Sequence, residues 1–218
     1  MTAAPAVLTV PAAAAAVPAV ARIRVATTSA ETQAIARLRY EVYVEEMGRR
    51  QPHADHAVRE IREPLDGEGM VLGAFLADGA AVGTLRVNTT ASPSIEFREL
   101  YGWEARAAAF PGATFLASKL VVARSRRQHS TAVDLMRAGA RLGVRNGWRF
   151  AWLDANAHLV QLYTRLGFRL QHERHHPLFG RVSIMELDLL DTAHLQSIRS
   201  PLVRDRLERL VPNTDAAA

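Results

Sequence analysis

Three arginines and a run of small polar residues stand together in the middle of the chain, where residues 124–131 read RSRRQHST. A turn that leads into a helix points free N–H groups at an anion, and the helix dipole adds to the attraction. Arg126 and Arg127 supply positive charge. Further hydrogen-bond donors are Gln128, His129, Ser130 and Thr131. The segment therefore predicts a phosphate-binding turn, with a solvated turn and a plain helix cap as the alternative.

A second pair of polar residues, Asn156 and Tyr163, follows the next apolar run. They stand seven residues apart, so in a helix over residues 157–166 they share one face, two turns apart. Together with the arginine turn, this pair indicates a candidate site for a ligand that carries a phosphate group. The alternative for Tyr163 is a core aromatic with a hydrated hydroxyl.

The composition excludes several kinds of chemistry. The chain has 218 residues and no cysteine, so it has no disulfide, thiol nucleophile or thiolate metal site, and we expect a cytoplasmic protein. The net charge of +5, with Lys119 as the only lysine, suits an anionic ligand or an acidic protein partner. No basic run alternates with aromatics as in nucleic-acid grooves, so we expect no nucleic-acid partner.

The histidines give no metal signal. We expect them to be solvated loop residues, because a metal needs three or four converging ligands with support behind them. The histidines in question are His53, His56, His172, His175 and His176. We therefore predict no metal site.

Hydrophobic periodicity and chain breakers predict the elements that must position these residues. The expected strands cover residues 22–26, 70–77, 81–88, 114–123, 148–154, 168–174 and 181–189. The expected helices cover residues 31–48, part of 95–110, 130–146 and 157–166, with Thr28 or Ser29 as a cap. This order predicts the α/β (α+β) class, with one mixed sheet, antiparallel strands in its middle and helices on both faces.

The remaining segments divide the chain. We expect residues 1–21 to be a disordered Ala/Pro-rich arm, residues 22–190 to be one domain and residues 191–218 to be a helical tail. Residues 49–69 form a long polar loop that we expect to face the substrate. No uninterrupted apolar stretch reaches about 18 residues, so we expect no membrane span.

The element order and the two motifs resemble the GNAT acyltransferase superfamily, over roughly residues 22–190. The family's donor signature is Arg or Gln, two residues, Gly, one residue, then Gly or Ala, and here Arg127, Ser130 and Ala132 stand at these positions. Ser130 departs from the pattern. The resemblance implies a largely antiparallel GNAT-like sheet, a coenzyme A or related thioester as donor, and Tyr163 as the general acid that protonates the leaving thiolate.

The N-terminal half resembles the acyl-carrier-protein-dependent branch of this superfamily, which includes acyl-homoserine-lactone synthases and long-chain N-acyl amino acid synthases. The matching segments read LRYEVYVEEMG, PLDGEG, VGTLRVN and SKL, and HHPLFG resembles the N-acyl amino acid synthases. The resemblance assigns Arg39, Asp66 and Arg86 to acceptor binding or support. The structural alternatives are an ion pair between Arg39 and Asp66 and a buried salt bridge at Arg86.

One acidic position of this branch is missing. Leu116 and Ala117 stand where the branch often carries Glu, which makes lactone synthesis a weaker expectation. Glu96 and Glu99 are the substitutes that we consider.

These residues predict direct acyl transfer from a thioester to an amine, without an acyl-enzyme. Backbone N–H groups of Leu120, Val121 and Val122 would polarise the thioester carbonyl, and water or Asp66 would take the proton of the amine.

The expected donor is acyl-ACP or acyl-CoA as a co-substrate, with no tightly bound cofactor. The expected acceptor is the amine of an amino acid, small molecule or peptide, and acyl carrier protein is the expected partner. An acetyl-CoA N-acetyltransferase and a non-catalytic binding module are the alternatives.

Overall fold

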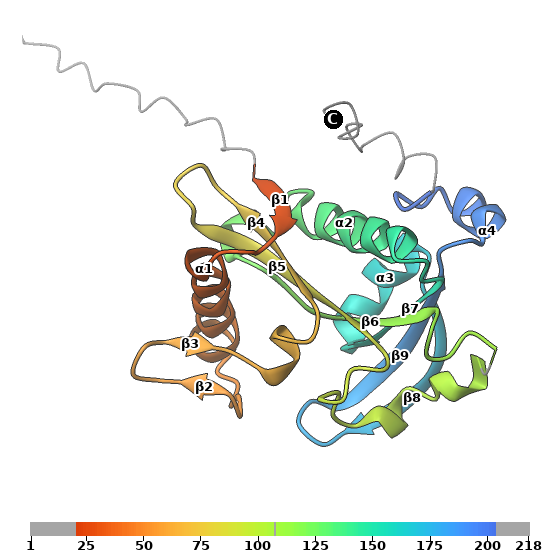
Figure 1. Ribbon diagram of the computed structural model, residues 1–218, viewed down its shortest axis with the longest axis horizontal. Coiled ribbons are helices and arrows are strands. Elements are labelled where there is room, and N and C mark those ends of the chain that lie inside the picture. The colour runs from red at the N-terminus through yellow and green to blue at the C-terminus, as the bar shows by residue number, and fades with distance from the viewer. Residues whose placement is uncertain (1–20, 107, 204–218) are drawn as a thin grey trace, which may run out of the picture.

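A seven-stranded sheet runs through the described part of the chain, residues 21–106 and 108–203 of the computed structural model (Figure 1). Its strand order is β1-β4-β5-β6-β7-β9-β8, and only β6 and β7 run parallel to each other. The strands are β1 (Arg22–Val25), β4 (Met70–Phe75), β5 (Ala81–Thr89), β6 (Thr114–Val122), β7 (Phe150–Ala155), β8 (Arg169–His176) and β9 (Gly180–Asp188). The predicted mixed, largely antiparallel sheet is confirmed.

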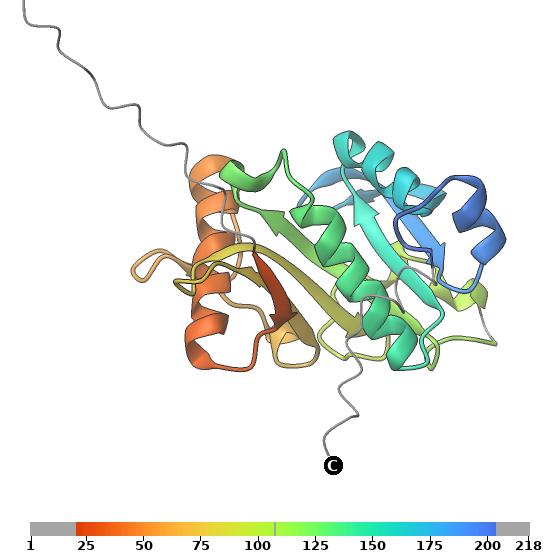
Figure 2. The same ribbon diagram turned by 90° about the horizontal axis from the view of Figure 1, so that it is seen from above.

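Helices cover both faces of this sheet (Figure 2). The helices are α1 (Ser29–Tyr40), α2 (Thr131–Arg145), α3 (Val160–Leu166) and α4 (Thr192–Ser197). Thr28 caps α1, and Glu31 bonds back to the Thr28 backbone, which satisfies N–H groups that the helix itself leaves free. The helix then continues as a π-helical turn over Glu41–Glu46.

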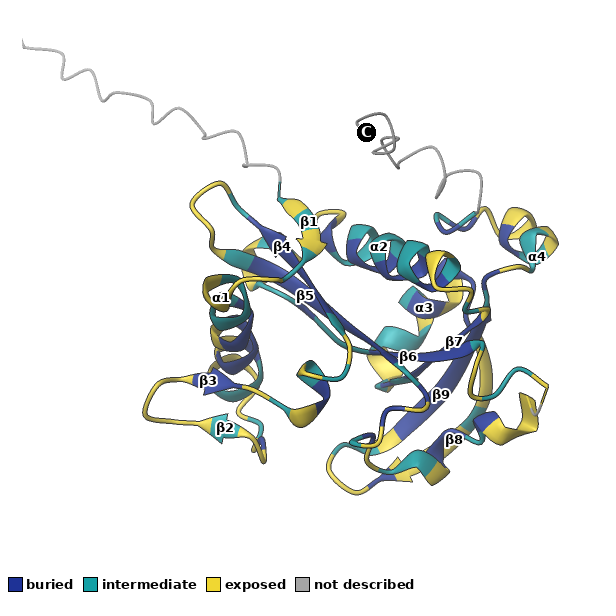
Figure 3. Cartoon of the chain, viewed as in Figure 1, coloured by how far each residue is buried: buried dark blue, intermediate teal, exposed yellow. Residues whose placement is uncertain are grey.

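Strand β4 shows how the side chains divide between the two layers. Val71 and Phe75 belong to a buried cluster with Ile35 of α1, whereas Leu72 and Ala74 belong to the cluster that contains Leu135 of α2. Side chains alternate along a strand, so each face receives every second residue. The central strands are accordingly buried along most of their length (Figure 3).

On the side of α1, an irregular segment covers the other half of the sheet. It contains 3₁₀ turns at Arg98–Leu100 and Trp103–Arg106, separated by Gly102 at φ 63°. The helix expected in part of residues 95–110 is therefore two short turns, because a left-handed residue interrupts it. Trp103 anchors this cover against Leu116 and Trp152.

Strands β6 and β7 separate after a short stretch of pairing. They pair only from Thr114 to Leu116 on β6 and from Phe150 to Trp152 on β7. Farther along, β6 bulges: Val121 pairs with Thr84 and Ser118 with Arg86, so two β6 residues stand opposite Leu85. Lys119, one of those two, has a left-handed φ of 55°. The sheet thus opens where its central strand changes direction.

The two ends of the chain are only partly described. Of the expected arm, residues 1–20 lie outside the described residues, as do residues 204–218 of the expected tail. The described part of that tail contains α4. The expected loop at residues 49–69 holds a small antiparallel ribbon of β2 (Ala54–Asp55) and β3 (Glu60–Ile61), followed by a 3₁₀ turn at Pro64–Asp66. None of the helices described is long and apolar enough to cross a membrane.

Candidate active site

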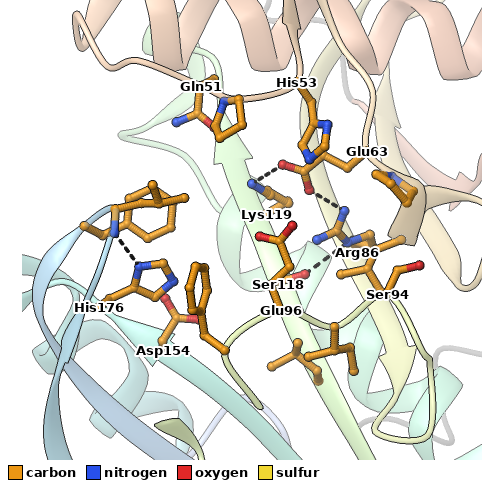
Figure 4. Close-up of a pocket in the computed structure, with 18 of the residues that line it drawn as sticks. Gln51, His53, Glu63, Arg86, Ser94, Glu96, Ser118, Lys119, Asp154 and His176 are labelled. Atoms are coloured by element: carbon orange, nitrogen blue, oxygen red, sulfur yellow. Dashed lines mark hydrogen bonds and ion pairs between the residues drawn. The ribbon is translucent and has the colours of Figure 1, made fainter. Parts of the chain in front are cut away.

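Two cavities meet at the opening of the sheet. The first, here called the front pocket, has a volume of about 390 Å³ and lies on the α1 side, between residues 51–65, residues 93–101 and the β8–β9 hairpin (Figure 4). The second, here called the inter-strand cavity, has a volume of about 120 Å³ and is lined by residues of β6, β7 and α3. Both are lined by Ser118, Lys119, Asp154 and Phe179. These four residues therefore form the junction between the cavities.

Five charged side chains form an ion-pair cluster at the front pocket. Nη1 of Arg39 donates to both carboxylate oxygens of Asp66 at 2.8 Å. Nη1 of Arg86 lies 2.6 Å from Glu63 Oε2 and 3.2 Å from Asp66 Oδ1. Nζ of Lys119 lies 2.6 Å from Glu63 Oε1. Two carboxylates thus join three cations, and both arginines are buried.

The electrostatics of this cluster keep its carboxylates ionised. Burial alone raises the pKa of Glu63, but Lys119 and Arg86 outweigh it and hold that pKa below its usual value. The pKa of Asp66 is likewise lowered, because Arg39 outweighs burial. Burial lowers the pKa of Lys119, against the opposing effect of Glu63. Asp66 is consequently a weak proton acceptor whose oxygens already hold Arg39 and Arg86, and the ion pair that the sequence left as an alternative is present.

Asp154, at the junction, is a residue that sequence reasoning missed. The hydroxyl of Tyr101 donates to its Oδ1 at 2.8 Å, and Oδ2 has no hydrogen-bond partner in the described part of the chain. The only sequence signal for a role of Asp154 was its position at the end of the strand expected over residues 148–154. The partner Tyr101 is 53 residues away, so the contact depends on how the covering segment folds.

His176 also lies in the front pocket, contrary to the expectation of a solvated loop histidine. Its side chain is 7% exposed because the β8–β9 hairpin places it between Phe179, with ring centroids 4.4 Å apart, and Phe97, at 4.8 Å. The backbone N–H of Leu178 donates to Nδ1 at 3.0 Å, so the neutral ring carries its proton on Nε2. Burial lowers the pKa of His176 and thereby favours this neutral form.

His172 also differs from the expectation, because it is half-buried in β8 and its Nε2 lies 2.8 Å from the carbonyl oxygen of Leu100. His56 is an exposed loop residue, as expected, although its Nδ1 lies 2.8 Å from the hydroxyl of Tyr40. No group of three or more metal-ligating side chains comes together within the residues described.

The two glutamates considered as substitutes for the missing acid behave differently. Glu96 lines the front pocket, and its carboxylate has no hydrogen-bond or ion-pair partner among residues 21–106 and 108–203. Glu99 lies in the following 3₁₀ turn, is exposed and lines neither cavity. Of the two, only Glu96 can contact a ligand in the front pocket.

The inter-strand cavity contains the predicted pair of Asn156 and Tyr163. Tyr163 is buried, packs edge-on against Phe168 and has no hydrogen-bond partner for its hydroxyl in the part of the chain described. Burial raises its pKa well above the usual value, so the hydroxyl stays protonated at neutral pH. Asn156 precedes the 3₁₀ turn that leads into α3.

The three β6 residues whose N–H groups were expected to polarise the thioester carbonyl have different surroundings. Leu120 lines the inter-strand cavity. Val121 packs with Leu38 and Val42 on the α1 side, and Val122 packs against the core on the α2 side. Only Leu120 of the three therefore presents a side chain to this cavity.

The arginine turn follows β6 directly and is open to solvent. Arg127 pairs with Glu46, at 2.7 Å between Nη2 and Oε2, and also donates to the carbonyl oxygen of Val122. Arg126 has no anionic partner among the residues described. The hydroxyl of Ser130 bonds to Asp134 at 2.5 Å and does not cap α2.

The remaining residues of this turn lie at or just before the start of α2. Gln128 and His129 are exposed, whereas Thr131 is buried at the first turn of the helix. The first N–H groups of an α-helix lack intrahelical partners, and no side chain caps them here. The start of α2 therefore keeps the donors that an anion would use.

Comparison with known proteins shows the family and the fold of the chain. A family model described as "N-acyl amino acid synthase FeeM" matches residues 34–188, more than half of the chain. No curated protein matches the chain by sequence. Among solved structures, FeeM, an N-acyl amino acid synthase from uncultured soil microbes, aligns with a TM-score of 0.64 at 14% identity, over 82% of this chain and 97% of FeeM.

Two acyl-homoserine-lactone synthases share the same fold. BjaI, a CoA-dependent synthase solved with SAM and isopentyl-CoA, gives a TM-score of 0.61 at 17% identity, over 88% of this chain and 98% of BjaI. LasI gives 0.62 at 16% identity, over 82% of this chain and 96% of LasI. The resemblance to GNAT-like acyl synthases is confirmed, and the chain belongs to the FeeM N-acyl amino acid synthase family of acyltransferases.

Proposed function

We propose that the chain transfers a medium- or long-chain acyl group from a phosphopantetheine thioester to the amine of an amino acid or peptide. The observation that carries this proposal is the junction of the two cavities at Ser118, Lys119, Asp154 and Phe179. A thioester that enters by one cavity and an amine that enters by the other would meet there. Holding both reactants in contact supplies much of the rate enhancement of a direct transfer.

The donor would enter along the opening between β6 and β7. Its phosphate would bind at the open start of α2, near Arg126 and the N–H groups that no side chain caps. The thioester carbonyl would lie beside the bulge of β6, where backbone N–H groups near Leu120 stand outside regular pairing. Acyl-CoA and acyl-ACP both carry this phosphate and thioester, and the exposed Arg124 suits the acidic surface of a carrier protein.

The front pocket would receive the acyl chain and the acceptor. A volume of about 390 Å³ lies within the usual range of small-molecule sites. Its lining includes apolar side chains from all three enclosing segments and from β6, namely Leu65, Ile95, Phe97, Leu116, Leu178 and Phe179. This surface supports a chain longer than acetyl.

The reaction would proceed in one displacement. The neutral amine nitrogen attacks the thioester carbonyl carbon, the C–S bond breaks, and an amide and a thiol leave. Asp154, directly or through water, takes the proton of the amine, since its Oδ2 is free and it faces both cavities. Tyr163 donates its proton to the sulfur. Asp66, expected from the sequence as a proton acceptor, instead holds Arg39 and Arg86.

A thioester panel tests this proposal. Thiol release would be measured with acetyl, C8 and C16 donors on coenzyme A and on acyl carrier protein, with product detection by mass spectrometry. We expect amide product and faster turnover with C8 or C16 than with acetyl. Fastest turnover with acetyl-CoA would instead identify an N-acetyltransferase, and tight donor binding without thiol release would identify a non-catalytic module.

A further inference from the structure

Lys119, the only lysine of the chain, has a strained backbone within β6. Its φ of 55° lies in the left-handed region, which is unfavourable by about 1–2 kcal/mol for a residue with a side chain. The residue belongs to the bulge, where β6 places two residues opposite Leu85 of β5. Bulges and strained residues are frequent next to reactive sites, where they aim a side chain. The surroundings of the Lys119 side chain show where it is aimed.

The side chain of Lys119 lies at the junction of the two cavities, both of which it lines (Figure 4). It is 14% exposed, with Nζ 2.6 Å from Glu63 Oε1 and 5.5 Å from the centre of the Tyr43 ring. An ammonium group has three N–H donors. Glu63 is its only anionic partner or hydrogen-bond acceptor among the residues described, so donors remain for a ligand at the junction.

The ion-pair cluster carries one positive charge more than it needs. It joins three cations to two carboxylates, and Arg39 and Arg86 alone would balance Glu63 and Asp66. Arg39 lines neither cavity, and Arg86 lines only the front pocket. Of the three cations, Lys119 alone reaches the place where both cavities meet. The surplus positive charge of the cluster is therefore presented to a ligand there.

Asp154 lines both cavities as well, and the proposed transfer connects it with Lys119. The amine nitrogen and the thioester oxygen become parts of one tetrahedral intermediate, so the groups that serve them must surround one point. When Asp154 accepts the proton of the amine, its carboxylate becomes neutral. The negative charge is then on the thioester oxygen, where a fixed cation stabilises it more than it stabilises the uncharged substrate.

We infer that Lys119 is a catalytic residue of the proposed transfer, whose ammonium group stabilises the negative oxygen of the tetrahedral intermediate. The amine nitrogen bonds to the carbonyl carbon, and an electron pair of the C=O bond moves to the oxygen. Lys119 binds this oxygen and keeps its own proton. The electron pair then returns, the C–S bond breaks and the thiolate leaves. The cluster is the scaffold that fixes the ammonium group. This inference rests on the proposed acyl transfer and deepens it.

Infrared spectroscopy of a bound donor tests the inference without turnover. The probes are octanoyl-CoA and octanoyl-ACP with ¹³C at the thioester carbonyl, bound without acceptor, and subtraction of the ¹²C spectrum isolates the C=O stretch. We expect this stretch at a lower frequency in the unmodified protein than in Lys119→Met, because a nearby cation polarises the bond. Arg174→Met, which removes an exposed cation of β8, should match the unmodified protein. Equal frequencies in the unmodified protein and Lys119→Met would overturn the inference.

Turnover separates a catalytic from a structural role of Lys119. Lys119→Met should lower kcat for thiol release about 100-fold, with the donor KM nearly unchanged, as the loss of one oxyanion donor does. The variant also takes one cation from Glu63, so Lys119→Met combined with Glu63→Gln removes the carboxylate charge as well. We expect kcat of this double variant to stay low. Recovery of kcat in it would show a structural role and overturn the inference.

The outcomes separate the inference from the proposed function. Equal C=O frequencies, with amide product still formed, would overturn the inference and leave acyl transfer intact. Absence of thiol release with every donor would overturn the proposed function, and a lower C=O frequency in the unmodified protein than in Lys119→Met would still support the contact of Lys119 with the carbonyl. Absence of binding of both probes would overturn both.

Discussion

The ion-pair cluster at the front pocket and the arginine turn before α2 are both rich in arginine, but they hold it differently. The side chains of Arg39 and Arg86 are 1% and 3% exposed and are joined to Glu63 and Asp66. The side chain of Arg127 is 42% exposed, and Arg126 has no anionic partner among the residues described. A buried cation needs a fixed partner, whereas the exposed pair of Arg127 with Glu46 contributes little stability and can be exchanged for a ligand. We therefore propose that the cluster is scaffold and that the turn, where Arg126 has no such partner in the described part of the chain, binds the donor.

Stability should show the largest contrast between the two regions. Arg86→Met leaves the half-buried Glu63 and Asp66 with fewer partners, and we expect the free energy of unfolding to fall by about 3–5 kcal/mol. Arg127→Met removes an exposed pair and should cost less than about 1 kcal/mol. Urea unfolding of both variants measures the difference. Similar losses in the two variants would show that the cluster is not scaffold.

Turnover should depend on the inter-strand cavity more than on either arginine region. Tyr163→Phe removes the proposed proton donor for the thiolate while keeping the ring against Phe168. We expect kcat for thiol release to fall about 100-fold or more, with little change in the donor KM. Tyr40→Phe is the matched control, because its hydroxyl contacts His56 outside both cavities. Unchanged turnover of Tyr163→Phe at all pH values would remove the general acid.

Donor binding should depend on the turn. Replacing Arg126 and Arg127 together by Ala should raise the donor KM by about tenfold, and added salt should shrink the effect because the turn is exposed. Replacing the exposed Arg174 and Arg181 of β8 and β9 removes the same charge elsewhere and should leave the donor KM unchanged. If both double variants raise the KM equally, the turn has no specific role.

Acid should weaken the cluster, and this effect should be the smallest. The pKa values of Glu63 and Asp66 are lowered from 4.5 and 3.8 in the folded protein, so their contribution is present above those values and is lost as the pH falls through the lowered ones. Unfolding free energies from pH 7 to pH 3 should therefore fall more steeply for the unmodified protein than for Arg86→Met. Parallel curves would contradict the assignment.

Local patterns allowed much of the fold to be predicted, because strands, turns and caps depend on neighbouring residues. The cap at Thr28, one of the two that the sequence offered, and the strands expected at residues 70–77 and 81–88 are examples. The same holds for the pairing of Arg39 with Asp66, which the sequence offered as an alternative.

Contacts between distant segments could not be predicted in this way. Arg127 meets Glu46, 81 residues away, and Asp154 meets Tyr101, 53 residues away. The burial of His176 depends on aromatic rings of two separate segments. Such contacts follow from strand pairing and from the bulge of β6, which no local pattern in the sequence indicates.

The central claim is that acyl transfer occurs where the two cavities meet. Asp154→Asn tests it most directly, because it keeps the shape of the junction and removes the proton acceptor. Steady-state thiol release with the preferred donor should show kcat reduced about 100-fold or more, with the donor KM unchanged and with Asp78→Asn, in an exposed turn, behaving as the unmodified protein. Full turnover by Asp154→Asn would contradict the account.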